Sequence, residues 1–321
     1  MRVSVSEMST NALKDLNLLP VSELEKKIEN PSKGNFPKSI LQNCVDNFAY
    51  SKNANSASLP STTMNGSVVE SNGADGGTME VEYVETERLT DLPSVETTLD
   101  TLMVRLDSKD WVTVCEALNN VRQLSIYHKE KLVALFPDLI PKIVKSLKNP
   151  RSALCKTAIM TCGDIFKFHN DSIIDFLDPL LLQLLLKSSQ DKRFVCEASE
   201  TALIAMTTWI SPSLLLPKLQ PHLKSKNPRV RAKASICFSR SVPRLGSEGM
   251  KAYGISSLIQ IAAAQLSDQL PESREAARAL AAELQASFER ESSVSWEAFC
   301  QAELTALSAQ AILRVTSASK E

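Results

Sequence analysis

Apolar residues recur every three or four positions from Leu92 almost to the end of the chain. Examples are Val114, Leu118, Val121 and Leu124, and farther along Ala202, Leu203 and Met206. This spacing places apolar side chains on one face of an α-helix. Prolines, Asn-Pro pairs and Asp-rich turns interrupt the pattern at short intervals, and no alternating apolar run bounded by hairpin turns occurs. The pattern therefore predicts an all-α fold.

Five predicted helix starts resemble one another, and each follows a turn. They align on Cys115, Cys155, Cys196, Arg231 and Arg274, which lie 40, 41, 35 and 43 residues apart. This period is typical of HEAT-like helix pairs, which bury their apolar faces by stacking on their neighbours. Residues 91–321 are thus predicted to form a HEAT-repeat, armadillo-like solenoid of about five to six helix pairs. Trp209 and Trp296 are expected to fill core or inter-repeat space.

The first 90 residues have a different composition. Residues 51–90 are rich in Ser, Asn, Gly, Thr and Glu and hold few large apolar side chains, which is typical of a disordered linker. The upstream segments Val21–Ile28 and Ile40–Phe48 are too short to be stable helices on their own. Residues 1–90 carry 8 basic and 12 acidic side chains, whereas residues 91–321 carry 28 and 25. We expect residues 1–90 to be an acidic, disordered tail that adds nothing to the stability of the domain at 91–321.

Composition also restricts the class of protein. No stretch approaches the roughly 18 consecutive apolar residues of a membrane span, and the start of the chain has no apolar signal-peptide core. The seven cysteines are odd in number and scattered, as is typical of reduced thiols inside a cell. We therefore expect a cytoplasmic protein that does not bind membranes.

The sequence lacks the motifs of an enzyme or a metal site. Cys155, Cys162 and His169 are seven residues apart and form no CxxC motif, so they fit buried small residues better than metal ligands. The three histidines lie in or beside the predicted repeat helices, without a pattern of nucleophile and carboxylate. A net charge of +3 over residues 91–321 disfavours nucleic-acid binding. We expect no catalysis, no cofactor, no small-molecule substrate and no nucleic-acid partner.

The turns inside the helix pairs should lie along one edge of the stack. This edge carries Trp111 in the first turn and then basic residues: Arg151, Lys192, Arg193, Lys226, Arg229 and Arg274. A Trp beside basic side chains is typical of an interface for an acidic partner. Helix N-capping alone would explain Asp110 and Asn149, and basic turns need no function, so spacing leaves both interpretations open. The Trp111 ring itself either folds back onto its helix or lies exposed as an anchor.

Several segments resemble the repeats of TOG domains. They are SLKNPRSALCKTAIMTCGDIF at 146–166, DKRFVCEASETALIAM at 191–206 and SKNPRVRAKA at 225–234, which are similar to the second, third and fourth repeats. The Asp110-Trp111 turn is similar to the first. The resemblance is to the TOG domains of cytoplasmic linker-associated proteins (CLASP) and of TOG-array regulators of axonemal microtubules, and it covers the whole predicted solenoid.

TOG domains bind the αβ-tubulin dimer through this turn edge. The resemblance therefore implies a non-enzymatic binding module for αβ-tubulin or microtubules, located at the cytoskeleton, with all seven edge residues named above facing tubulin. The fifth turn departs from the family pattern, because Pro271 and Glu272 lie close to Arg274. Arg231 fits an anchor between repeats better than an edge contact. The alternative is a HEAT or armadillo adaptor that holds a protein or peptide partner on its concave helix face.

Overall fold

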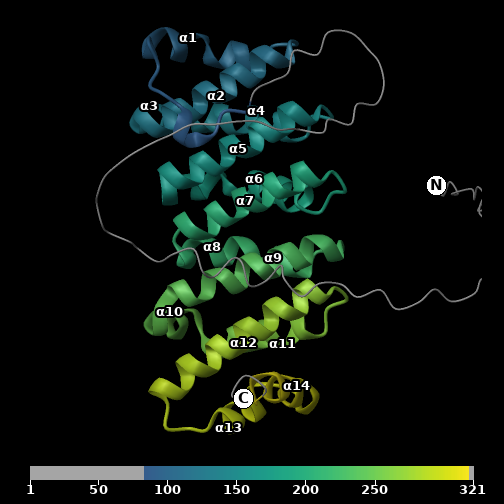
Figure 1. The fold of residues 1–321 in the computed structure, drawn as a ribbon. Coiled ribbons are helices and arrows are strands. Elements are labelled where there is room, and N and C mark those ends of the chain that lie inside the picture. Colours follow the sequence, from purple (N-terminus) through teal and green to yellow (C-terminus); the bar gives the residue numbers. More distant parts are fainter. Residues whose placement is uncertain (1–82, 318–321) are drawn as a thin grey trace, which may run out of the picture. The chain divides into compact units, whose positions relative to one another are not determined.

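The computed structural model describes residues 83–317, which belong to one compact unit, Asp75–Glu321. Every regular element in this described range is a helix, so the all-α prediction is confirmed (Figure 1). Six helix pairs follow one another: α1 (Val95–Leu106) with α2 (Trp111–Tyr127), α4 (Phe136–Leu147) with α5 (Ser152–His169), α6 (Leu177–Lys187) with α7 (Arg193–Trp209), α8 (Pro212–Leu219) with α9 (Pro228–Ser241), α11 (Ile255–Leu266) with α12 (Pro271–Glu291), and α13 (Trp296–Glu303) with α14 (Ala306–Ser317).

Short helices connect some of the pairs: α3 (Lys129–Val133), α10 (Gly246–Tyr253) and the 3-10 helices Asn170–Phe176 and Val242–Leu245. Two further 3-10 helices lie elsewhere: Thr86–Arg88 precedes α1, and Gln220–Lys224 lies between α8 and α9. The second helices of the first five pairs, α2, α5, α7, α9 and α12, pack side by side in chain order. Figure 1 shows this succession from α1 to α14. The predicted HEAT-repeat stack of five to six pairs is therefore confirmed.

The core consists of the apolar stripes seen in the sequence. Val114, Leu118, Val121 and Leu124 are all buried, as are Ala202, Leu203 and Met206. Trp296 is also buried, and its indole Nε1 donates a hydrogen bond to Thr316 Oγ1 over 3.2 Å. The prediction for Trp209 was wrong, because this side chain ends α7 and is 46% exposed. Both tryptophans lie at a helix end, but Trp296 is covered by Phe288 of α12 and by Thr316 of α14, whereas Trp209 is half exposed.

The segment just before residue 91 contacts the first two repeats. Residues 83–91, which we call the strap, lie on α2 and α5 instead of forming part of a separate tail. Arg122 Nη1 donates to the carbonyl oxygen of Val84 over 2.7 Å, and Thr86 Oγ1 donates to Asp164 over 2.7 Å. These contacts join residues 83–90, which the predicted boundary at 90/91 assigns to the tail, to α2 and α5. The rest of the predicted tail, including Val21–Ile28 and Ile40–Phe48, lies outside the described residues.

The strap encloses a buried ion pair between the first two repeats. Arg122 is 1% exposed, and its Nε lies 2.5 Å from Asp164 Oδ2. Leu89, at the other end of the strap, is buried as well, and its carbonyl oxygen accepts a hydrogen bond from the Tyr127 hydroxyl. A buried charge pair is stable only when its remaining donors and acceptors are satisfied. The strap supplies two of those groups, so it is part of the fold.

No helix within the described residues is long and apolar enough to cross a membrane.

Candidate functional site

The turns inside the helix pairs gather at one edge because the second helices pack side by side. We call this the turn edge, defined by residues 107–111, 148–152, 188–193, 225–229 and 267–274. Asp110 and Asn227 cap the helices that follow them: Asp110 accepts hydrogen bonds from the backbone amides of Val112 and Thr113, and Asn227 accepts one from that of Arg229. These bonds fix where α2 and α9 begin. The Thr113 hydroxyl also donates to Asp110 over 2.6 Å, and this bond, followed by the two amide bonds, holds the pKa of Asp110 below its usual value.

Trp111 and Arg151 lie against each other, although they belong to different repeats. The Arg151 guanidinium carbon is 4.5 Å from the centre of the Trp111 ring, which is within the range of a cation–π contact. Trp111 is partly buried and packs against the core, whereas Arg151 is exposed. The ring is therefore neither fully buried nor free at the edge: one side packs against the core, and the Arg151 guanidinium lies over its face.

The third turn continues this basic surface. Lys192 is exposed, and its Nζ donates to the hydroxyl of Ser152, the first residue of α5, over 3.0 Å. Arg193 is also exposed, and its Nε lies 2.7 Å from Glu197 one helical turn farther along α7. Hydrogen bonding to Glu197 raises the pKa of Arg193. Lys192 is thus tied to the preceding turn, and Arg193 to its own helix.

The fourth turn contributes two exposed basic side chains, Lys226 and Arg229. Arg229 Nη1 donates to the carbonyl oxygen of Ser189 over 3.0 Å and lies 3.3 Å from Asp191 Oδ1. Asp191 therefore pairs with a cation of the next turn. Six of the seven predicted residues, from Trp111 to Arg229, accordingly lie on or beside turns one to four.

Arg274 is set apart from the other six. Its Nη1 donates to the carbonyl oxygens of Asp268 and Gln269, both over 2.9 Å, so its guanidinium holds its own turn in shape. Arg231 holds the fourth turn in the same way, because its Nη1 donates to the carbonyl oxygen of Ser225 over 2.8 Å. Its Nε also donates to Asp268 Oδ2 over 2.7 Å. Arg231 therefore links two repeats, as expected from the sequence, and Arg274 serves its own turn.

The cysteines aligned with these arginines have a related role. The Cys155 thiol donates to the carbonyl oxygen of Leu147, and the Cys196 thiol donates to that of Ser188, in the turn before each helix. At four of the five aligned positions, the side chain thus donates to the backbone just before or within its own turn, whether it is a thiol or a guanidinium. Burial raises the pKa of Cys155, which fits an unreactive structural thiol.

Other clusters in the described residues do not form a chemical site. No group of three or more His, Cys, Asp or Glu side chains among them has the geometry to hold a metal ion. His169 is buried with its ring edge-on to Phe136, and burial, followed by the nearby charge of Lys129, lowers its pKa to about 4. It is therefore neutral near pH 7 and packs as a core residue.

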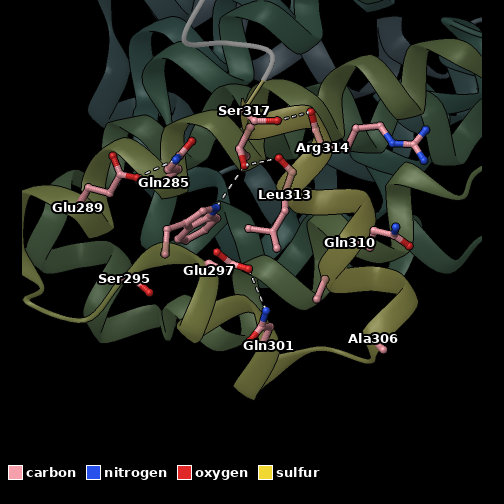
Figure 2. A pocket seen from close by; sticks show the side chains of 13 residues that line it. Gln285, Glu289, Ser295, Glu297, Gln301, Ala306, Gln310, Leu313, Arg314 and Ser317 are labelled. Carbon is pink, nitrogen blue, oxygen red and sulfur yellow. Dashed lines mark hydrogen bonds between the residues drawn. The ribbon is translucent and has the colours of Figure 1, made fainter.

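A cavity of about 970 Å³ lies between α12, α13 and α14, far along the chain from the first four turns (Figure 2). Polar side chains around it bond to one another: Gln285 Nε2 donates to Glu289 over 2.7 Å, and Gln301 Nε2 donates to Glu297 over 3.1 Å. The Trp296 indole is paired as well, with Thr316 Oγ1, so these three donors at the cavity already have partners in the chain.

The face of the second helices is partly occupied by the chain itself. The strap lies on α2 and α5, where Tyr83 stacks under Lys156 Nζ at 4.0 Å. Beside it, the strap residues Glu85 and Glu87 form one wall of a groove of about 440 Å³ between α5 and α7. An adaptor that holds a peptide along the whole of this helix face would need the part that the strap covers. The structure therefore disfavours the adaptor alternative.

Sequence reasoning missed the groups that hold the edge cations. Ser152, Ser189 and Asp191 contact basic side chains about 40 residues away. The only local signal was their place in or next to a predicted turn. The contacts depend on how neighbouring repeats stack, which composition and periodicity do not specify.

Comparison with known proteins agrees with this architecture. The CLASP N terminal family matches residues 121–305. The chain is 30% identical over 122 residues to TOG array regulator of axonemal microtubules protein 1 of Mus musculus, and the match covers 37% of this chain and 7% of that protein. It is 27% identical over 132 residues to the Homo sapiens protein of the same name, covering 41% and 8%. The matches therefore span less than a tenth of these relatives.

Two solved structures share the fold. The N-terminal domain of MAST/Orbit aligns with a TM-score of 0.52 at 14% identity, covering 72% of this chain and 98% of that one. The TOG domain of C. elegans Zyg9 aligns with a TM-score of 0.53 at 17% identity, covering 69% and 82%. The TOG-type fold expected from the repeat segments is thus confirmed. Since the family match covers more than half of the sequence, the chain belongs to the CLASP N-terminal family, whose helical repeats it carries.

Proposed function

We propose that this protein is a microtubule-associated module that binds αβ-tubulin or microtubules through its turn edge. The observation that carries the proposal is the continuity of that edge: turns two, three and four each present exposed basic side chains, and the first turn supplies an aromatic ring beneath one of them. The contact residues are Trp111, Arg151, Lys192, Arg193, Lys226 and Arg229. Arg274 is excluded because it is half-buried, unlike the other five cations, and its guanidinium bonds to its own turn.

The chemistry of the edge suits a folded, acidic protein surface. Exposed cations raise the rate at which an acidic partner is encountered, and a partly buried Trp at the first turn adds apolar contact area. A mildly basic domain with its cations concentrated on one edge directs that attraction to one side of the molecule. Membership of a family whose relatives include a regulator of axonemal microtubules supports tubulin as the partner.

The same proposal assigns the protein no catalytic role. Binding a protein surface through side chains on short turns needs no nucleophile, metal ion or cofactor. A tubulin-binding role also places the protein at the cytoskeleton in the cytoplasm. The domain boundary that we propose runs from about residue 83 to the end of α14, with the preceding residues acting as a tail.

Charge reversal at the edge tests the proposal. The variant Arg151→Glu with Lys192→Glu should bind tubulin dimer at least about tenfold more weakly, or about 1.4 kcal/mol, mainly through slower association. Its control is Arg240→Glu with Arg290→Glu, which changes the net charge equally at the C-terminal ends of α9 and α12, well away from the turns. If both variants lose the same affinity, only net charge matters and the edge assignment fails. Thermal unfolding of both variants verifies that they are folded.

A further inference from the structure

The cations of the turn edge follow a common rule. Each of the three, Arg151, Lys192 and Arg229, contacts a group of the preceding turn that lies 40 residues earlier in the chain. Arg151 lies on the Trp111 ring, Lys192 donates to the Ser152 hydroxyl, and Arg229 donates to the carbonyl oxygen of Ser189. The arrangement thus recurs in three consecutive repeats.

The basic residues that do not obey the rule provide a contrast. Arg193 pairs with Glu197 on its own helix, and Arg274 bonds to its own turn. The contact with the preceding turn is therefore made by one basic residue in each of turns two to four, and Arg274 of the fifth turn does not make it.

We propose that Trp111 and Ser152 are positioning residues, which hold Arg151 and Lys192 in place for the partner before it arrives. The inference rests on the proposed function of the same edge. Free Arg and Lys side chains lose considerable rotamer freedom when they bind, and a side chain that is already held loses less. Trp111 therefore acts on the partner largely through the guanidinium on its ring, and Ser152 acts through the Lys192 ammonium.

The Trp111–Arg151 and Ser152–Lys192 contacts can be tested by substitution, because in each of them a side chain holds the cation. Arg229 is held partly by a backbone carbonyl, which substitution does not remove. Ser152 lies at the first position of α5, where a change to Ala leaves the helix backbone intact. Trp111 also packs against the core, so its replacement can affect packing as well as the contact with Arg151. Two variants are therefore compared: Trp111→Leu, which removes the ring under Arg151, and Trp111→Phe, which keeps one.

A double-mutant cycle on tubulin affinity is the first measurement. Ser152→Ala should weaken binding about three- to fivefold in the full chain, and it should have no further effect when Lys192 is already Ala. Ser152→Thr, which keeps the hydroxyl, should restore the original affinity. The same cycle with Trp111→Leu and Arg151→Ala should show the same lack of additivity, and Trp111→Phe should retain most of the affinity. Additive losses, or an unchanged affinity for Ser152→Ala, would overturn the proposal.

A second measurement needs no partner. Side-chain ¹⁵N relaxation of Arg151 Nε–H in the unbound protein should report restricted nanosecond motion, and Trp111→Leu should release it whereas Trp111→Phe should not. Unchanged motion in Trp111→Leu overturns the positioning role whatever the protein binds. A wild-type chain that shows the restriction but does not bind tubulin contradicts the proposed function alone, so the two failures are distinguishable.

Discussion

The buried pair beneath the strap predicts a large effect of a nearly isosteric substitution. Asp164→Asn keeps the shape of the side chain and removes its charge. Arg122, which is 1% exposed, would then keep its positive charge without a carboxylate partner. Breaking a buried ion pair in this way costs about 3–5 kcal/mol. We expect the lower end of that range, because Arg122 retains the carbonyl oxygen of Val84 and the Asn119 side chain as acceptors.

Thermal unfolding followed by circular dichroism measures this effect. For a domain of this size each kcal/mol lowers Tm by roughly 2–4 °C, so Asp164→Asn should lower it by about 6–12 °C. The matched control replaces both charges, Arg122→Met with Asp164→Leu, and should lose much less stability, because no charge is left buried alone. A Tm within about 2 °C of the wild type for Asp164→Asn would refute the reasoning, since it would mean that the charge of Arg122 is not buried.

Truncation examines the strap directly. A chain that begins at Leu92 lacks the carbonyl oxygen of Val84, the Thr86 hydroxyl and the buried Leu89 side chain, so it should unfold at a clearly lower temperature than the full chain. A chain that begins at Asp75 keeps the strap and should match the full chain. If the chain from Leu92 is as stable as the other two, the strap is not part of the fold.

Three further predictions concern single side chains. Burial lowers the pKa of His169 from 6.5 to about 4, so between these pH values the unfolded chain binds a proton that the folded chain does not, and stability should fall as the pH drops from 6.5 toward 4. Between pH 7 and pH 5 the Tm of His169→Leu should therefore fall by less than the Tm of the wild type. Equal decreases in Tm would contradict this. Arg274→Ala should lower Tm but leave tubulin affinity within about twofold, because its guanidinium bonds to its own turn; a tenfold weaker complex would return Arg274 to the contact surface. In a Cys44→Ser variant, Cys196 should react with a thiol reagent before the other five cysteines, which are buried, and mass spectrometry of the labelled peptides would detect any other order.

Local pattern was sufficient to predict the repeated elements. The apolar stripe from Val114 to Leu124 predicted a buried helix face, and the turn before each second helix marked where α2, α5 and α9 begin. These features depend on residues within about four positions of each other. The alignment on Cys155 and Arg231 also located a repeated structural role, although it did not reveal that both side chains bond to the backbone of their own turns.

Contacts between distant residues could not be predicted in this way. Thr86 lies in a segment whose polar composition is typical of a linker, yet it bonds to Asp164, 78 residues later. The Trp111–Arg151 and Ser152–Lys192 contacts likewise depend on how one repeat is placed on the next. Trp209 looked like a core residue because it belongs to an apolar helix, but its place at the helix end leaves it half exposed. The missing information was the stacking geometry in each case.

The affinity of the full chain for tubulin dimer, measured at two salt concentrations, tests the central claim most directly. Five basic side chains on turns two to four face the proposed acidic partner: Arg151, Lys192, Arg193, Lys226 and Arg229. Raising the ionic strength from about 50 to 200 mM should weaken the complex at least about tenfold, because exposed charges are screened over a shorter distance. An affinity that does not change with salt, or the absence of a complex at the lower concentration, would contradict the assignment of the turn edge as a tubulin-binding surface.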